Sequence, residues 1–222
     1  MRAFRLAMLV FVAVGGTRSA AAQAEPRAAV VAEFTNPALS PSHWTMTLYR
    51  DGSGHFHSQR GGLKTTDSSS MDAPDIDRGF QVSSEFAEQT FKVAWEHKWF
   101  SEQCESHMKV AFQGWKKISY QGPEGKGSCT FNYSKDKEIQ SLGDSLTGLA
   151  ETLIEGARLE TLKQHDRLGL DKEMDYMAEA LKDGRLREIG AIQEILMRLE
   201  DDPTVLDRVR KRARALLAQS VR

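Results

Sequence analysis

The sequence lacks every short motif that would assign a catalytic activity. Serine is plentiful, but no G-x-S-x-G nucleophile elbow is present. The run Gly122-Pro123-Glu124-Gly125-Lys126-Gly127 resembles a phosphate-binding loop only superficially, because no helix that begins with Lys-Ser or Lys-Thr follows it. Glycine and proline at this density are typical of a hairpin turn. No internal repeat period is visible either. We therefore predict no catalytic residue and no cofactor.

Long hydrophobic runs are also missing. The apolar run at 6–14 is too short to span a hydrocarbon core of about 30 Å, which argues against a membrane anchor. Arg2 and Arg5 precede this run and small residues follow it up to Ala24, so we predict a secretory signal peptide over residues 1–24. No cysteine follows the apolar run, which excludes a lipoprotein anchor.

Small residues at positions 22 and 24 favour cleavage after Ala24, and cleavage after Ala22 is a close alternative. Cleavage removes three arginines and no acidic residue, so the 30 basic residues become 27, against 31 acidic ones. The mature chain is therefore mildly acidic. We expect it in the periplasm or outside the cell, with no transmembrane span, and export disfavours a nucleic acid partner.

Cysteine is scarce, since the chain contains only Cys104 and Cys129. An even number of cysteines in an oxidising compartment favours a disulfide between them, and two buried free thiols are the alternative. A redox-active pair is disfavoured because such cysteines usually lie two residues apart at a helix start. The bridge would close a loop of about 25 residues, worth about 3 kcal/mol on the chain-entropy model. It would fasten the exit of a helix to a sheet.

The composition is that of a globular protein. With 222 residues, 40% hydrophobic and 27% charged, the chain is long enough for one large or two small cores. We predict an α+β domain over 25–135, with a small antiparallel sheet, one helix and the disulfide. An all-α bundle of about four helices over 136–222 is expected to follow, because apolar residues there recur every three or four positions.

The first half alternates between strand patterns and turn signals. We expect one helix after a Ser83 or Ser84 cap, with an apolar stripe that includes Phe91 and Trp95. Residues 60–77 are polar and show no period, so we expect a mobile loop there. The expected strands are 30–34, 43–50, 55–59, 80–83, 108–112, 115–120 and 128–133.

The hairpin after residue 43 has two possible registers. A three-residue loop with Gly54 in the left-handed conformation would pair Leu48 with Phe56. It would also put His55 and His57 on the polar face, with Thr47 and Tyr49 as their cross-strand partners. A two-residue turn would shift the register by one residue and would put both histidines on the apolar face of the hairpin instead. We favour the first register, because it leaves both histidines outside the apolar set.

Two imidazoles on one strand face could begin a zinc or copper site. His55 and His57 are therefore the candidate metal ligands. Thr47 and Tyr49 are poor third ligands, however, and the sequence places no carboxylate beside them. We therefore predict a solvated strand face and no metal site.

The second half has helical periodicity throughout. Helices are expected at 139–164, 170–181, 185–199 and 205–218, with Gly184 as a C-cap and Pro203 at a first helical position. The last helix carries five cations, which form either a solvated face or a contact with an anionic envelope surface. These cations are Arg208, Arg210, Lys211, Arg212 and Arg214.

A signal peptide, a D-G-S-G hairpin, a V-A-F-Q-G segment, a C-T-F-N-Y-S segment and helices of the type L-A-E-T-L-I-E-G-A-R-L follow one another. This succession resembles uncharacterised exported bacterial proteins. The resemblance covers most of the mature chain and implies no activity. We expect an exported, non-enzymatic binding or structural protein of the bacterial envelope, whose partner is another envelope protein or an anionic surface. The alternative is a secreted hydrolase or metal-dependent enzyme with a site between the two domains.

Overall fold

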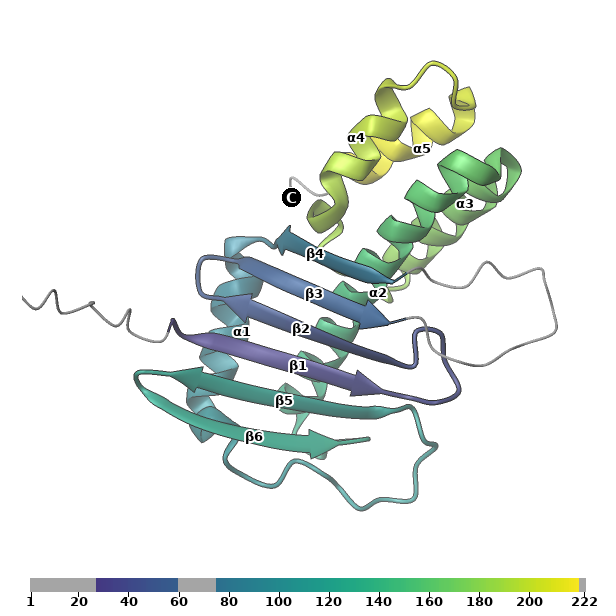
Figure 1. The fold of residues 1–222 in the computed structure, drawn as a ribbon. Coiled ribbons are helices and arrows are strands. Elements are labelled where there is room, and N and C mark those ends of the chain that lie inside the picture. Colours follow the sequence, from purple (N-terminus) through teal and green to yellow (C-terminus); the bar gives the residue numbers. More distant parts are fainter. Residues whose placement is uncertain (1–26, 60–74, 220–222) are drawn as a thin grey trace, which may run out of the picture.

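The computed structural model describes residues 27–59 and 75–219, which form a six-stranded antiparallel sheet and five α-helices (Figure 1). The predicted α+β class is confirmed. The predicted signal peptide and most of the predicted polar loop lie outside the described residues. None of the helices within the described ranges combines the length and the apolarity that crossing a membrane requires.

The sheet has the strand order β4-β3-β2-β1-β5-β6, with every neighbouring pair antiparallel. The strands are β1 (Ala29–Thr35), β2 (His43–Tyr49), β3 (Ser53–Gln59), β4 (Ile76–Gln81), β5 (Trp115–Gly122) and β6 (Gly125–Phe131). The helices are α1 (Ser84–Glu96), α2 (Lys137–His165), α3 (Arg167–Lys182), α4 (Gln193–Asp201) and α5 (Asp207–Leu217). Two 3-10 turns, Lys98–Phe100 and Ile189–Ile192, precede β5 and α4.

Side chains alternate between the two faces of the sheet, as the strand geometry requires. The inner face is apolar, with Phe34, Met46 and Phe56 buried, and α1 and α2 lie behind it (Figure 1). The outer face is polar, and none of the described helices covers it. It presents Glu33, Lys117 and the two histidines of β3.

Helix α2 connects the sheet to the other helices. Its first half packs on the sheet, where Gly143 lies against Phe131, and its second half extends past β4 to α3, α4 and α5 (Figure 1). The buried apolar residues of the sheet and the helices form one cluster. Asp136 accepts hydrogen bonds from the backbone N–H groups of Glu138 and Ile139 and thereby caps α2. The division of the chain at residue 135 stays a prediction.

The register of the β2–β3 hairpin differs from the predicted register by two residues. Leu48 pairs with Gly54 and Met46 pairs with Phe56, and Gly52, with φ +78°, is the left-handed residue of the loop. Gly54 has a different role, because a Cβ there would lie 2.2 Å from the Phe80 ring. A shift of two preserves the faces, so the histidines lie on the polar face as predicted.

Three predicted strands differ from the structure. Residues 108–112 form no strand, because their alternating apolar side chains have neither face buried. The strand predicted at 80–83 is β4, which begins at Ile76, because Ile76 is itself a core residue. The strand predicted at 128–133 begins at Gly125 and ends at Phe131, so it follows the turn directly.

Three further predictions, all for the helical half, differ from the structure. The helix predicted over 185–199 is broken, because Glu188 adopts φ 51° and only α4 is regular α-helix. The Glu188 carboxylate accepts hydrogen bonds from the Ser83 backbone N–H and hydroxyl, at 2.6 and 3.0 Å, and thereby joins this break to the start of α1. Pro203 is not a first helical residue, since α5 begins at Asp207. Gly184, predicted as a C-cap, instead follows the C-cap residue Asp183 and is the left-handed residue after α3, with φ +74°.

Candidate functional site

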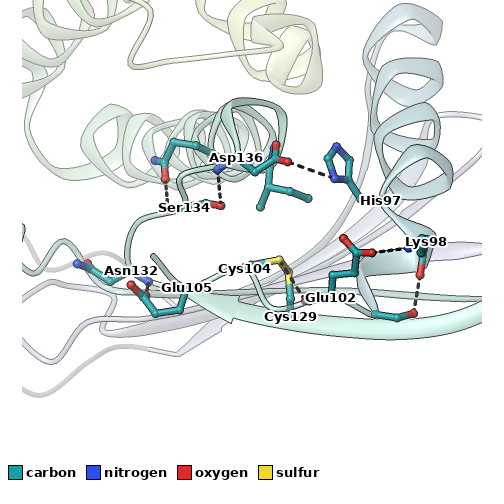
Figure 2. Close-up of a disulfide and its surroundings, with 12 residues drawn as sticks. His97, Lys98, Glu102, Cys104, Glu105, Cys129, Asn132, Ser134 and Asp136 are labelled. Atoms are coloured by element: carbon teal, nitrogen blue, oxygen red, sulfur yellow. Dashed lines mark hydrogen bonds and ion pairs between the residues drawn. A yellow bond between two sulfur atoms is a disulfide. The ribbon is translucent and has the colours of Figure 1, made fainter. Parts of the chain in front are cut away.

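The predicted disulfide between Cys104 and Cys129 is present, with the two Cα atoms 5.7 Å apart. Figure 2 shows the bridge between the segment that follows α1 and strand β6. The side chain of Cys129 points to the inner face of the sheet, where Cys129 pairs with Ile118 of β5. The bridge therefore fastens the exit of α1 to the inner side of the sheet.

A left-handed turn lies between α1 and the disulfide. Lys98, Trp99 and Phe100 have φ values of 50°, 60° and 62°. Left-handed backbone costs about 1–2 kcal/mol for each residue with a side chain, so three in succession need compensating contacts. Phe100 is buried, and the Trp99 ring stacks on the Tyr120 ring with centroids 4.2 Å apart.

The glycines of β6 make room for this turn. A Cβ on Gly125 would lie 2.4 Å from the Trp99 ring, and one on Gly127 would lie 2.3 Å from the Trp99 carbonyl oxygen. The β5–β6 hairpin turns at Pro123 and Glu124. The glycine-rich run thus serves the turn and the close approach of Trp99, in agreement with the prediction that it is structural.

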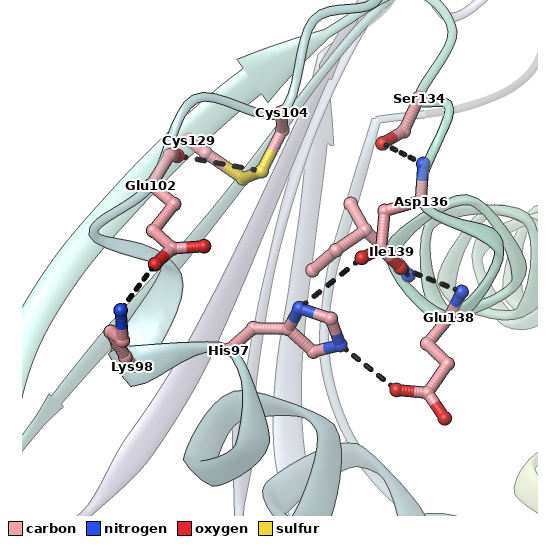
Figure 3. A network of polar contacts seen from close by, with 9 residues as sticks. All are labelled: His97, Lys98, Glu102, Cys104, Cys129, Ser134, Asp136, Glu138 and Ile139. Atoms are coloured by element: carbon pink, nitrogen blue, oxygen red, sulfur yellow. Dashed lines mark hydrogen bonds and ion pairs between the residues drawn. A yellow bond between two sulfur atoms is a disulfide. The ribbon is translucent and has the colours of Figure 1, made fainter.

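His97 joins the end of α1 to the start of α2. Figure 3 shows its ring between two carboxylates, with Nδ1 3.6 Å from Asp136 Oδ2 and Nε2 2.9 Å from Glu138 Oε2. The two carboxylates approach opposite edges of the ring, so one ion cannot bind all three groups. The cluster is a link between helices.

Residues 107–113, here named the strap, are held at both ends. Glu105 accepts hydrogen bonds from the backbone N–H groups of Asn132 and His107, at 2.7 and 2.9 Å. Burial raises the pKa of Glu105, but these backbone donors outweigh burial and keep the pKa below its ordinary value. At the other end, the Asn132 side chain accepts from the Gln113 N–H at 2.8 Å and donates to the Ala111 carbonyl.

The strap presents apolar side chains to solvent. All seven of its residues are exposed. Met108, Val110 and Phe112 have exposed fractions of 51%, 40% and 52%. The Phe112 ring meets the ring of Trp115, another exposed residue, with centroids 5.9 Å apart. The strap and Trp115 therefore form an apolar surface on an anchored segment.

A groove lies on α1 beside the left-handed turn, and we name it the Trp95 groove. The sequence assigned Trp95 to the buried stripe of α1, but Trp95 is 65% exposed. Its ring meets the Trp99 ring edge to face at 5.1 Å. The groove is open, has a volume of about 420 Å³ and is lined by Arg50, Ala87, Glu88, Phe91, Lys92 and Trp95.

The predicted metal candidates contact a carboxylate that the sequence did not place. His55 Nε2 lies 2.7 Å from Asp77 Oδ1, and His57 Nδ1 lies 3.3 Å from Asp77 Oδ2. Their cross-strand partners are Thr47 and Thr45. Asp77 was assigned to a loop, but it lies in β4 beside the histidines. Across the part of the chain that the structure describes, no group of three or more His, Cys, Asp or Glu residues is arranged to hold a metal ion.

The five predicted surface cations of α5 all contact groups within the bundle. Two of them join α5 to α3, two join it to Glu200 at the end of α4, and one pairs within α5. The pairs are Arg208 with Asp171, Arg212 with Asp171 and Asp175, Arg214 with the Glu200 carboxylate, Arg210 with the Glu200 carbonyl, and Lys211 with Asp207. Four of the five cations therefore join α5 to α3 or α4, and a contact with an anionic surface stays a prediction.

A buried acid between α2 and α3 was not predicted from the sequence. Glu155 is only 3% exposed, and burial, followed by a hydrogen bond with Glu173, raises its pKa to about 9. Arg158 donates to both Glu155 oxygens, at 2.9 and 3.0 Å, and lowers the pKa, but it does not offset the other two causes. Burial and the neighbouring Glu173 therefore favour the protonated form of Glu155. The only signal in the sequence was its position beside the apolar stripe of α2.

No protein-family model and no curated protein matches this chain. The arguments about function therefore depend on the surfaces described above.

Proposed function

We propose that this protein is an exported, non-enzymatic binding protein of the bacterial cell envelope, which binds another envelope protein through the strap. The observation that carries the proposal is the exposure of Met108, Val110 and Phe112 in a segment that is anchored at both ends. Exposed apolar surface on an anchored segment of this kind is typical of interaction sites in proteins. It is costly to leave in water without a partner.

The anchoring of the strap favours binding. A segment that must be ordered on association loses conformational entropy, typically about 0.5–1.5 kcal/mol for each immobilised side chain. The strap is already restricted by Glu105, Asn132 and the disulfide. Part of its conformational entropy is therefore lost when the protein folds, and less remains to be lost on binding. The Phe112–Trp115 pair supplies the aromatic residues that are common at the centre of interfaces, and Met108 adapts easily to a partner's shape.

Export is supported by two independent features. Residues 1–24 have the pattern of a signal peptide. The Cys104–Cys129 disulfide is of the kind that persists in oxidising compartments and is rare in the cytosol. We propose that the mature protein begins at Glu25 and lies in the periplasm or outside the cell. Fractionation with intact-mass measurement tests this, and a cytoplasmic chain that retains residues 1–24 would refute it.

Site-specific photo-crosslinking tests the strap. A photoreactive phenylalanine analogue at Val110 is compared in living cells with the same analogue at Glu194, an exposed residue of α4. We expect a discrete cross-linked product from position 110 and none from position 194. Phe112→Ser should weaken that product without changing the melting temperature by more than about 2 °C, because Phe112 is half exposed. Equal products from both positions, or none from position 110, would contradict the proposal.

A further inference from the structure

We propose that the Trp95 groove binds the sugar rings of a neutral glycan chain. This inference goes beyond protein binding through the strap and uses other residues, so either proposal can fail alone. The groove lies between α1 and Arg50 and combines an exposed indole ring with charged side chains of both signs.

The first argument is the fixed orientation of the Trp95 ring. An exposed tryptophan usually has several rotamers, but Trp99 meets the Trp95 ring edge to face at 5.1 Å with an interplanar angle of 81°. Trp99 in turn stacks on Tyr120, and Phe91 meets Tyr120 edge to face at 6.2 Å. These four rings support one another, so the exposed indole is held ready to receive a ligand.

The backbone fixes the support for this ring. Lys98, Trp99 and Phe100 are held in the left-handed conformation, which orients Trp99 between Tyr120 and Trp95. Strained backbone of this kind persists only where the surrounding structure holds it, and it concentrates at ligand-binding and switching sites. Here the buried Phe100 and the nearby disulfide hold it.

The second argument is the mixture of charges around the ring. Arg50 and Lys92 are donors, and Glu88 is an acceptor. Arg50 is already oriented, since its guanidinium lies 4.9 Å from the Phe91 ring centroid and pairs with Glu124 at 3.0 Å. Both cations already have an acidic partner, Arg50 in Glu124 and Lys92 in Glu96, so with Glu88 added the surface offers an anionic ligand no net positive charge. An apolar ligand would have to desolvate all three side chains without replacing their hydrogen bonds.

A pyranose ring can use both the exposed aromatic ring and the mixture of hydrogen-bond donors and acceptors. The C–H groups on one of its faces pack on the negative face of an aromatic ring, and its hydroxyl groups both donate and accept hydrogen bonds. The groove is open rather than enclosed, so a bound chain of sugars can extend beyond it. A neutral glycan therefore matches this surface better than an anion or an apolar peptide.

The test uses the mature protein with two soluble tetrasaccharides, of β-1,4-linked N-acetylglucosamine and of β-1,4-linked glucose, in titration calorimetry. We expect binding of at least one tetrasaccharide with a Kd below about 1 mM, the range of weak but measurable affinity. Trp95→Ala should weaken it at least about tenfold. Trp115→Ala, which removes an exposed tryptophan outside the groove, should change it less than about twofold.

An NMR titration of the unmutated protein covers the case in which Trp95→Ala folds poorly. The indole N–H signal of Trp95 should move on addition of sugar, while that of Trp115 should not. The inference is overturned if neither tetrasaccharide binds at millimolar concentration, or if both variants weaken binding equally. Binding to vesicles of anionic phospholipid that depends on Trp95, without sugar binding, would overturn it in favour of a lipid surface.

Discussion

Trp99 stacks on Tyr120 with ring centroids 4.2 Å apart, and it does so from the middle of a three-residue left-handed turn. The two residues lie 21 positions apart in the sequence, so this contact joins the exit of α1 to strand β5. The strained turn exists because the stacked rings, the buried Phe100 and the disulfide together stabilise it. Both candidate binding surfaces, the strap and the Trp95 groove, depend on this region.

Removal of the disulfide should destabilise the whole fold. Cys104→Ser with Cys129→Ser frees a 25-residue loop, and we expect a loss of about 2–4 kcal/mol in the free energy of unfolding. Urea unfolding followed by tryptophan fluorescence measures it. Tryptophan emission from the folded variant should also change, because Trp99 loses part of its support. A variant as stable as the parent would show that the aromatic contacts hold the turn unaided.

Gly125→Ala should disturb the turn specifically. The added Cβ would lie 2.4 Å from the Trp99 ring, so Trp99 has to move from its stack on Tyr120. We expect a loss of about 1–3 kcal/mol, as for an overpacked core, together with a weaker near-ultraviolet circular dichroism signal.

Gly79→Ala is the matched control, because its Cβ would meet only the Gly54 carbonyl oxygen, at 3.7 Å. This control should stay within about 0.5 kcal/mol of the parent protein. Similar losses in both variants would mean that strand propensity, and not the contact with Trp99, is responsible.

Glu105→Gln should remove a stabilisation that depends on pH. The folded state lowers the pKa of Glu105, so its stabilising effect is present above the ordinary carboxyl pKa and is lost as the pH falls through the lowered value. We expect the variant to melt about 2–4 °C lower than the parent at pH 7. The two proteins should converge at low pH. A difference that persists unchanged down to pH 2 would exclude the carboxylate as its source.

The sequence predicted those features whose pattern is local. The alternation around His55 and His57 predicted the correct face of the sheet for both histidines. The predicted strand register was wrong by two residues, but a shift of two keeps every side chain on the same face. The apolar spacing of α2 likewise predicted a helix that the structure has at Lys137–His165. The even number of cysteines predicted their bridge.

The features that were missed depend on partners far along the chain. Nothing in Lys98-Trp99-Phe100 favours a left-handed turn, and its stabilising contacts come from Tyr120 and Gly125. Trp95 was assigned to the core because its spacing fits the stripe of α1, but it is 65% exposed and the buried stripe ends at Ala94. Asp77 was placed in a loop because polar residues on an edge strand resemble loop composition.

Glu155→Gln should stabilise the protein at alkaline pH. Because the folded state raises the pKa of Glu155 to about 9, the protonated side chain is favoured by folding. This stabilisation is fully present below the ordinary carboxyl pKa and is lost as the pH rises towards 9, where a buried charge must form beside Glu173. Glutamine has nearly the same shape as the protonated acid, keeps an N–H donor for Glu173 and cannot ionise. We expect the melting temperature of the variant at pH 9 to exceed that of the parent by at least about 2–4 °C.

Glu179→Gln, at an exposed position of α3, is the control and should show no such gain. A Glu155→Gln variant that is less stable than the parent at pH 9 would show instead that the ionised carboxylate, paired with Arg158, is the form that the fold requires.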